Sequence, residues 1–504
     1  MVSIGRKNSK ICFRRLFVRK SVENRLKAGF FLCNVEVSGL EYLGQIGERD
    51  MFSKKAFKAY DIRGVVPTEV NEEMAYRVGR VFAVMLGAES VVVGHDIRTT
   101  GRDLTNALSE GLRHAGVNVI DIGQCGTEMI YFATAYLKTD GGIMVTASHN
   151  PANYNGMKLV RRGAKPISED TGLKDIARMV VEGEIPEMLY PGTKEGKIEK
   201  YDIMPEYIQH ILTYVDITKL KPLKIVANPG NGGAGAVISE IEKHLPFEFV
   251  KINNEPDGTF PNGVPNPLLP ENRAATSKAV IENKADLGVA WDGDFDRCFF
   301  FDEHGNFIEG YYLVGLLAQV FLEKYPGEKI LFDPRLTWNT EEIIEEFKGQ
   351  PIRCKSGHAF IKECMRANGV IYGGEMSAHH YFRDFSYCDS GMIPWLMVTE
   401  LMSRTGISLA QLVAARVALY PCSGEINRKV ANSEQVLAQI KEKYADGKLD
   451  YLDGISVEYD KWRFNIRVSN TEPVMRLNVE SRGDEVLLQE KTAEVLTIMG
   501  GEEA

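Results

Sequence analysis

Residues 146–151, TASHNP, place a serine beside a histidine directly after an apolar run. The run, residues 143–145, predicts a buried strand. The polar turn then lies at the carboxyl end of that strand, where open α/β sheets bind ligands. Ser148 and His149 could therefore face a ligand, with Lys158 close behind them. Serine, asparagine and proline are also ordinary turn formers. On this segment alone, a plain turn is the better interpretation.

Residues 291–298, WDGDFDRC, hold three carboxylates within five positions. Asp292, Asp294 and Asp296 follow an apolar strand-like run, and carboxylate oxygens grouped in this way are the ligands that Mg²⁺ and Ca²⁺ prefer. An EF-hand is excluded, because its sixth loop position must be glycine and Arg297 stands there. The segment therefore predicts a divalent metal site, and Arg297 offers a guanidinium fork for phosphate beside it.

The segment GGEMSAHHYF, residues 373–382, carries groups suited to a sugar. Glu375 and Ser377 can bind sugar hydroxyls, and His379 and His380 are candidate proton carriers near neutral pH. A histidine in a loop is more often a hydrogen-bonding surface residue, so this segment alone does not establish catalysis.

The segment RVSNTEP, residues 467–473, concentrates phosphate donors. It combines a guanidinium fork, two hydroxyls, an amide and the N–H groups of a turn, supplied by Arg467, Ser469, Asn470 and Thr471. A polar hairpin turn explains the same residues equally well without further context.

A glycine-rich segment, GNGGAG at residues 230–235, matches the dinucleotide-binding pattern. It follows a strand-like run and precedes a helical one, and Glu255 lies twenty residues further on, as that pattern requires. Pro229 stiffens the preceding turn, however, and a nicotinamide site would leave the three aspartates and Ser148 without a function. We therefore interpret the glycines as a tight strand-to-helix turn.

From about residue 51 the chain alternates strand-like and helical patterns, which predicts α/β sheets covered by helices on both faces. Strands are expected at 90–96, 117–123, 141–147, 223–228, 285–294, 328–334 and 368–377, and helices at 104–116, 236–245 and 340–349. Near the end, residues 454–470 alternate as half-exposed strands do and residues 485–500 form a helical pattern, which predicts a small α+β domain. Linkers are expected at 190–200, 301–306 and 418–427, giving domains at 51–199, 200–304, 305–418 and 419–504.

The composition narrows the class of protein. A chain of 504 residues is too long for a single core, and a net charge of −9 gives no general basic surface for nucleic acid. The eight cysteines show no metal-site or C-x-x-C spacing, which suits reduced thiols in a cytoplasm. No apolar run is long enough to predict a membrane span.

The first fifty residues differ from the rest. They carry ten Lys or Arg against five Asp or Glu, a net charge of +5. Because the whole chain has a net charge of −9, the remaining residues have a net charge of −14. We interpret residues 1–50 as an atypical basic extension and Met51 as the natural start. A basic presequence is the alternative, since neither a clear cleavage site nor a long apolar core marks a signal peptide.

Together, the four polar segments resemble the α-D-phosphohexomutase family. In that family a T-A-S-H-N-P loop carries a phosphoserine, a D-G-D-x-D-R loop holds Mg²⁺, a G-E-M-S-x-H loop contacts the sugar, and an R-x-S-N-T-E-P loop binds phosphate. All four occur here in that order, and the resemblance extends from about Phe57 to about Arg482. Within the family, segments such as GEMSAHHYFRDF are most similar to the bacterial phosphomannomutase group.

The resemblance implies three related mixed-sheet α/β domains and a C-terminal α+β domain around a central active-site cleft. It implies an intramolecular phosphotransferase of the isomerase class that interconverts mannose 6-phosphate and mannose 1-phosphate for GDP-mannose synthesis in the cytoplasm. Mg²⁺ is the implied cofactor and a hexose 1,6-bisphosphate the activator. The implied catalytic residues are Ser148, Arg63, His149, Lys158 and His379; Ser148, Asp292, Asp294 and Asp296 would hold the metal ion; and Arg297, Glu375, Ser377, His379, Arg467, Ser469, Asn470 and Thr471 would bind substrate.

Other functions stay open at this stage. A phosphoglucomutase or a dual-specificity mutase differs only in the direction of one sugar hydroxyl, which no motif decides. A sugar-phosphate-binding protein without catalysis would keep Arg467 and Glu375 but could lose Ser148 or the three aspartates, and neither is lost. An NAD-dependent oxidoreductase is third. The sequence does not determine the oligomeric state.

We expect a chain that begins at Met51 to keep the melting temperature and activity of the full chain, because the α/β pattern begins only after that residue. Thermal unfolding and steady-state assays of the two proteins would measure this. A large loss of either property on removing residues 1–50 would show that the extension is part of the fold.

Overall fold

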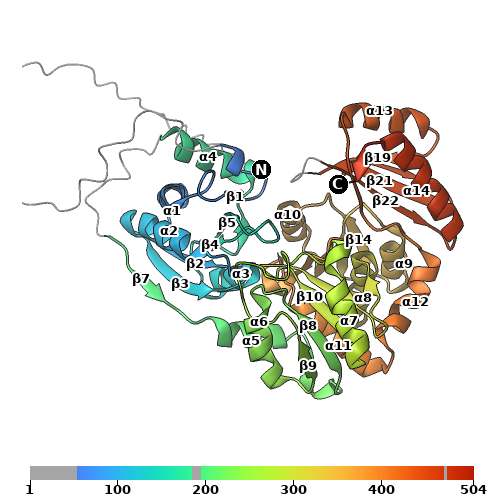
Figure 1. Cartoon of the computed structure of the whole chain (residues 1–504), viewed down its shortest axis with the longest axis horizontal. Coiled ribbons are helices and arrows are strands. Elements are labelled where there is room, and N and C mark those ends of the chain that lie inside the picture. The colour runs from blue at the N-terminus through green and yellow to red at the C-terminus, as the bar shows by residue number, and fades with distance from the viewer. Residues whose placement is uncertain (1–53, 184–194, 470–473, 504) are drawn as a thin grey trace, which may run out of the picture. The chain divides into compact units, whose positions relative to one another are not determined.

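The computed structural model describes residues 54–183, 195–469 and 474–503, all of which belong to one compact unit, Asp50–Ala504 (Figure 1). The extension predicted at residues 1–50 lies outside the described residues, and the domain boundaries stay predictions. In the described part of the chain, no helix is long and apolar enough to cross a membrane.

Four sheets follow one another along the chain. The first has the order β1-β5-β4-β2-β3-β7, with β6 beside β5, and contains β1 (Ile62–Val65), β2 (Ser90–His95), β3 (Asn118–Gln124), β4 (Gly141–Val145), β5 (Tyr154–Arg161), β6 (Lys165–Pro166), β7 (Ile198–Lys200) and helices α1 (Glu72–Leu86), α2 (Gly101–His114), α3 (Thr127–Tyr136) and α4 (Leu173–Glu182). The second, β12-β11-β10-β8-β9, contains β8 (Lys224–Asn228), β9 (Glu248–Lys251), β10 (Leu287–Trp291), β11 (Cys298–Phe301), β12 (Phe307–Ile308) and helices α5 (Met204–Leu212), α6 (Ala234–Ile241) and α7 (Ala274–Asn283).

The third sheet, β14-β13-β15-β16-β17, contains β13 (Lys329–Phe332), β14 (Gln350–Arg353), β15 (Tyr372–Gly374), β16 (His380–Phe382), β17 (Cys388–Asp389) and helices α8 (Gly310–Lys324), α9 (Trp338–Glu346), α10 (His358–Asn368), α11 (Ile393–Thr405) and α12 (Leu409–Leu419). The fourth, β19-β20-β21-β22-β18-β23, contains β18 (Ile426–Lys429), β19 (Lys448–Asp450), β20 (Ile455–Glu458), β21 (Trp462–Val468), β22 (Met475–Ser481), β23 (Glu502–Glu503) and helices α13 (Ser433–Lys443) and α14 (Glu485–Met499).

The first three sheets repeat one arrangement of strands. In each, a central strand (β2, β8 or β13) is parallel to a neighbour on both sides, and the second of these neighbours (β4, β10 or β15) pairs on its far side with an antiparallel strand. The fourth sheet is antiparallel throughout. The predicted class of three mixed α/β sheets and a C-terminal α+β part is confirmed.

Residues in or beside two of the predicted linkers take part in sheets. Residues 198–200 of the first linker form β7, which pairs in parallel with β3. Residues 302–306 form the turn between β11 and β12, where Asp302 Oδ1 accepts bonds from the backbone N–H groups of His304 and Asn306 at 2.9 and 2.8 Å. Turn-forming residues occur in hairpins as well as in linkers, so the turn predicted at 301–306 is compatible with both.

Strand alternation divides the apolar side chains of the first sheet between two cores. Val91 and Val93 on β2 face a core shared with α1, α2 and α4, whereas Val92 faces the core that includes α3. Figure 1 shows α1 and α2 side by side. The core around α3 continues through apolar residues of the second and third sheets, whereas the fourth sheet has a separate core with α13 and α14.

Glu128 on α3 joins elements of all three α/β sheets. Its carboxylate accepts bonds from the Tyr207 hydroxyl of α5, the Ser390 hydroxyl at 2.8 Å and the backbone N–H of Gly391, which follow β17. Burial raises the pKa of Glu128 to about 8, and the three donors only partly oppose that shift.

We expect the substitution Glu128→Gln to change how stability depends on pH. An acid whose pKa is about 8 in the folded chain but near 4.5 in the unfolded one makes the folded state less stable as the pH rises between those values, because the unfolded chain loses its proton first. Over that range the melting temperature of the parent should therefore fall relative to that of the variant.

Thermal unfolding at several pH values between 5 and 8 would measure this difference. Glu282→Gln on α7 is a matched control, because the side chain of Glu282 is 61% exposed. Parallel curves for the parent and Glu128→Gln would show that Glu128 has no raised pKa.

Candidate active site

Three of the predicted polar segments lie at equivalent places in the repeated topology. Residues 146–153, 292–297 and 375–379 each connect the strand β4, β10 or β15 to the antiparallel strand that follows it. Each loop also contains a residue with left-handed backbone: Ser148 has φ 48°, Phe295 has φ 46° and Ala378 has φ 71°. A non-glycine residue in that conformation costs about 1–3 kcal/mol and persists only where its surroundings hold it.

Residues 292–297, the metal loop, contact both residues 146–153, the serine loop, and residues 375–379, the sugar loop. A Cβ on Gly293 would lie 2.6 Å from the carbonyl oxygen of Ser148, so only glycine allows the metal loop to approach the serine loop this closely. Arg297 in the metal loop forms a backbone bridge with His379 in the sugar loop. The structure therefore brings the serine, the aspartates and the histidine together, although Ser148 and His379 are 231 positions apart in the sequence.

Ser148 is buried and its hydroxyl faces the metal loop. Ser148 Oγ donates to Asp292 Oδ2 at 2.9 Å and lies 3.1 Å from His149 Nδ1. Arg297 Nη2 donates to the same ring nitrogen at 2.6 Å. Burial, and to a smaller extent the positive charges of Arg297 and Arg63, hold the pKa of His149 well below its usual range. The ring is therefore neutral and supports Ser148 without carrying charge.

The three aspartates form a buried cluster in which one oxygen of each lies within 4.8 Å of the others. Lys158 on β5 donates to Asp294 Oδ2 at 2.7 Å and to Asp296 Oδ2 at 2.6 Å. Burial lowers the pKa of Lys158, but the two carboxylates outweigh burial and raise it, so the ammonium stays charged.

The cluster fits a metal ion. Asp294 Oδ1 and Asp296 Oδ1 are buried and have no hydrogen-bond partner among the described residues. Buried carboxylate oxygens without a partner are costly unless a cation binds them, and oxygen donors suit hard divalent ions. This donor set can therefore hold a metal ion.

Arg63 on β1 reaches the serine loop from the other side. Arg63 Nη1 donates to Asn150 Oδ1 at 2.8 Å, and its Nε donates to Asp61 Oδ2 at 2.8 Å. Burial opposes its charge, but Asp61 and Asp294 raise its pKa overall. Arg63 therefore contacts the serine loop through Asn150, and its role at the reacting centre stays a prediction.

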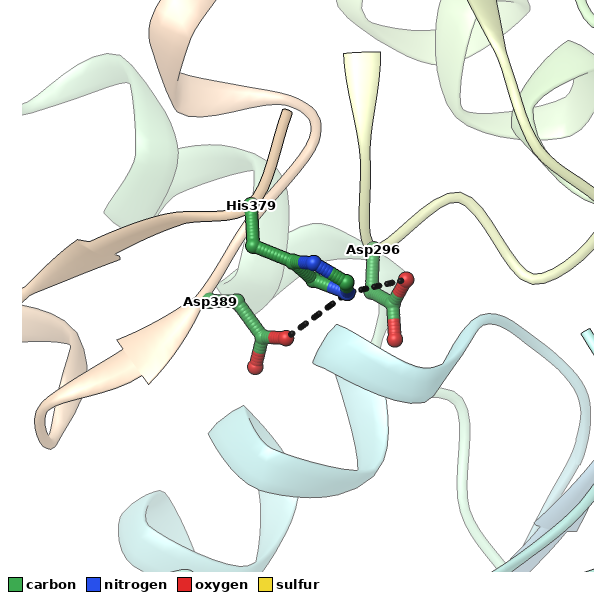
Figure 2. A group of neighbouring side chains, drawn as sticks. All are labelled: Asp296, His379 and Asp389. Atoms are coloured by element: carbon green, nitrogen blue, oxygen red, sulfur yellow. Dashed lines mark ion pairs between the residues drawn. The ribbon is translucent and has the colours of Figure 1, made fainter. Parts of the chain in front are cut away.

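His379 lies among three carboxylates, and Figure 2 shows it between Asp296 and Asp389. His379 Nε2 is 3.6 Å from Asp296 Oδ1 and 3.8 Å from Asp389 Oδ2, and Nδ1 is 3.6 Å from Glu375 Oε2. Burial lowers the pKa of His379, but the carboxylates outweigh it and raise the pKa. Asp389, which the sequence did not indicate, is itself paired with the buried Lys362 at 2.6 Å.

His380, also considered as a proton carrier, is a core residue. It begins β16, its Nδ1 lies 2.8 Å from the Tyr372 hydroxyl, and burial lowers its pKa to about 3. Successive side chains on a strand point to opposite faces, so His379 reaches the site while His380 packs into the sheet.

Glu375 and Ser377 are held by residues of the third sheet. Glu375 accepts bonds from Gly357 N at 3.0 Å and the Tyr381 hydroxyl at 2.6 Å. Arg335 Nη2 donates to Ser377 Oγ at 3.3 Å. Arg335, which the sequence did not single out, is buried after β13 and brings a further guanidinium to this loop.

The guanidinium of Arg467 lies near the carboxylate of Glu425, which directly precedes β18 of the same sheet. Its Nη2 lies 3.4 Å from Glu425 Oε2, which also accepts a bond from Arg335 Nη1 at 3.1 Å. Ser469 N donates to Val474 O at 2.9 Å, which continues the pairing of β21 and β22 by one residue on each strand. Asn470 and Thr471, predicted to bind phosphate, lie outside the described residues.

The glycines at 230–235 have packing roles. The segment does connect β8 to α6, as the dinucleotide pattern requires. A Cβ on Gly232 would lie 3.0 Å from Gly293 O, and one on Gly235 would lie 2.1 Å from Asn254 O. The glycines thus allow close packing against the metal loop and a neighbouring backbone, in agreement with a tight turn.

Comparison with known proteins adds independent evidence. Phosphoglucomutase/phosphomannomutase family models match the chain as alpha/beta/alpha domain I at residues 54–184, domain II at 205–305, domain III at 309–420 and the C-terminal domain at 425–497. A Xanthomonas campestris protein named "Phosphohexose mutases" is 58% identical over 448 residues, or 88% of this chain and 99% of the relative.

Two further relatives agree. An Escherichia coli protein named phosphomannomutase is 56% identical over 451 residues, or 88% of this chain and 98% of the relative. The crystal structure of a phosphoglucomutase/phosphomannomutase family protein from Burkholderia thailandensis is 32% identical, covers 90% of this chain and 100% of its own, and superposes with a TM-score of 0.80. The predicted relationship is confirmed: the chain belongs to the phosphoglucomutase/phosphomannomutase family of phosphohexomutases and is an enzyme of the isomerase class.

Proposed function

We propose that the chain interconverts mannose 6-phosphate and mannose 1-phosphate through a phosphorylated Ser148 and a hexose 1,6-bisphosphate intermediate. The observation that carries the proposal is the contact between Ser148 Oγ and the aspartate cluster, 2.9 Å from Asp292 Oδ2. In a cytoplasm, the product would supply GDP-mannose synthesis. The phosphomannomutase name of relatives that match nearly their whole length supports the choice of sugar.

The reaction consists of two phosphoryl transfers. In the first, the bond between phosphorus and Ser148 Oγ breaks, a bond to O1 of mannose 6-phosphate forms, and the proton of that sugar hydroxyl passes to Ser148 Oγ. The bisphosphate then turns around, the bond between phosphorus and O6 breaks, a bond to Ser148 Oγ forms, and the proton of the serine hydroxyl passes to O6. His379 would move the proton, and Lys158 and Arg63 would face the developing negative charge.

A metal ion would add to this charge compensation. Asp292, Asp294, Asp296 and a phosphorylated Ser148 would hold it, and we propose Mg²⁺ because the donors are all oxygens. When bound, it offsets negative charge on the transferred phosphoryl group. Arg297 and His149 would keep Ser148 and Asp292 in place.

The sugar and its second phosphate would be held by separate loops. Glu375, Ser377 and His379 would bind sugar hydroxyls, and Arg467, Ser469, Asn470 and Thr471 would bind the phosphate that is not reacting. The bisphosphate would also serve as the activator that restores phosphate to Ser148 when it escapes.

A coupled assay tests the choice of substrate. Mannose 6-phosphate and glucose 6-phosphate would be compared in the presence of Mg²⁺ and a hexose 1,6-bisphosphate primer. We expect turnover of mannose 6-phosphate that depends on the primer. Turnover of glucose 6-phosphate alone would replace the proposal with a phosphoglucomutase, and comparable turnover of both would mean a dual-specificity mutase.

We expect purified protein to carry phosphate on Ser148, at least in part. Mass spectrometry of the peptide that contains Ser148 would detect it, and Ser148→Ala should lose both the phosphate and the activity. An active protein with phosphate only on other residues would refute the role of Ser148.

Substitutions in the metal loop and in the proposed phosphate-binding segment, residues 467–473, should affect the kinetics in different ways. Asp294→Asn removes one anionic ligand from a site that offsets transition-state charge, so the loss should fall mainly on kcat and added primer should not restore it. Arg467→Ala removes a contact made in both ground and transition states, so KM should rise more than kcat falls, and the bisphosphate should escape more often.

Steady-state kinetics with titrated primer would measure both variants. Arg467→Ala should need more primer than the parent, whereas Asp294→Asn should not respond to it. A pure kcat defect without primer dependence in Arg467→Ala would show that Arg467 does not hold the distant phosphate.

A further inference from the structure

Arg98, which follows β2, binds three carbonyl groups of the serine loop and the first carbonyl group of β5. Its Nη2 donates to Ser148 O at 2.9 Å and to Asn150 O at 2.5 Å. Its Nη1 donates to Pro151 O at 2.7 Å and to Tyr154 O at 2.8 Å. The side chain is fully buried. One guanidinium thus binds backbone carbonyl groups from Ser148 to Tyr154 and restrains this part of the backbone.

Asp96 contacts both the guanidinium of Arg98 and Thr146, the first residue of the serine loop. Its Oδ2 lies 3.3 Å from Arg98 Nε and accepts a bond from Thr146 Oγ1 at 2.6 Å. Thr146 Oγ1 in turn accepts a bond from Ser148 N at 2.8 Å. Both backbone groups of Ser148 are therefore attached to this pair, the N–H through Thr146 and the carbonyl through Arg98.

Ser148 needs such support because its backbone is strained. Its φ of 48° is a conformation that non-glycine residues seldom adopt, and it directs Oγ toward Asp292. The loop cannot hold this conformation through its own apolar contacts, since residues 148–154 are mostly polar. The four bonds from Arg98 to backbone carbonyl groups restrain the loop from outside.

The same device recurs at the equivalent strand of the third sheet. Asp333 and Arg335 follow β13 with the spacing of Asp96 and Arg98 after β2. Asp333 Oδ2 accepts a bond from Met376 N at 2.9 Å, so an aspartate there also holds the loop that follows the neighbouring parallel strand, β15. Two sheets of different sequence thus use an Asp-x-Arg segment to support the neighbouring loop.

We propose that Arg98, oriented by Asp96, is a positioning residue that holds Ser148 in the strained conformation in which its hydroxyl can accept and donate a phosphoryl group. The inference rests on the proposed function of Ser148. Arg98 does not touch the substrate, and its effect passes through the backbone of the serine loop.

Substitution of Arg98 should slow phosphoryl transfer and leave substrate binding nearly unchanged. Arg98→Lys keeps the charge but cannot donate to four carbonyls from one planar group. The rate at which glucose 1,6-bisphosphate phosphorylates Ser148 should fall by on the order of 100-fold, because a small displacement of a reacting atom has an effect of that size. KM for mannose 6-phosphate should change little.

The experiment is a rapid-quench measurement on dephosphorylated full-length protein with glucose 1,6-bisphosphate and Mg²⁺, with phosphorylated Ser148 quantified by mass spectrometry. Arg80→Lys on α1 is the matched control, because Arg80 is also a buried arginine of the first sheet's domain but bonds Tyr76 instead of the loop. The shift of melting temperature on adding Mg²⁺ reports whether the aspartate cluster is intact.

Slow phosphorylation in Arg98→Lys, with normal phosphorylation in Arg80→Lys and an unchanged Mg²⁺ shift, would support the proposal. Parental rates in Arg98→Lys, or equal losses in both variants, would overturn it. If Arg98→Lys does not fold, Asp96→Asn replaces it, and parental rates in that variant would overturn the proposal equally. Absence of phosphate on Ser148 in the parent itself would instead refute the proposed function, and this inference with it.

Discussion

The site depends on charges from different sheets that neutralise one another where water is excluded. Lys158 comes from the first sheet and contacts Asp294 and Asp296 of the second, and the three side chains are 8%, 0% and 4% exposed. An unpaired buried charge costs several kcal/mol, so Lys158 on β5 and the aspartates of the metal loop depend on each other to stay buried as charged groups. Arg297 and Asp292 repeat this dependence within the metal loop, at 2.8 Å.

The repeated topology explains why such different loops meet. Each occupies the turn between a parallel strand and the antiparallel strand beside it, and each contains one residue with left-handed backbone. A strand order that recurs three times therefore provides three equivalent positions, on which one loop carries a hydroxyl, one carries carboxylates and one carries groups suited to sugar. Gly293 lets two of these loops touch.

The order of motifs along the chain was enough to predict the family, the three mixed sheets and the proximity of Ser148 to the aspartates. Their chemistry is predictable because a strand pattern shows where a loop begins and because carboxylates seldom cluster without a cation. The supporting residues were not predictable in the same way. Arg98 and Glu128 are single charged residues whose partners are backbone atoms or residues from distant segments, and sequence spacing carries no record of such contacts.

Histidines show the same limit at a finer scale. His379 and His380 are neighbours with equal chemistry, and only the strand that begins at His380 decides which of them faces the site. The turn predicted at 301–306 is present, but local turn chemistry does not reveal whether the strands on either side belong to one sheet, as β11 and β12 do.

The fourth sheet is joined to the third by hydrogen bonds between polar groups, whereas its apolar residues form a separate core. Arg463 donates to the carbonyl oxygens of Pro334 and Arg335 at 2.9 and 3.0 Å, and its partner Glu480 accepts a bond from Thr337 N at 2.8 Å. The side chain of Arg335 meanwhile reaches Ser377. A displacement of the fourth sheet would therefore disturb the support of the sugar loop as well, because both depend on the backbone that follows β13. This connection ties the residues proposed to hold the distant phosphate to those proposed to hold the sugar, although the two groups belong to separately packed cores.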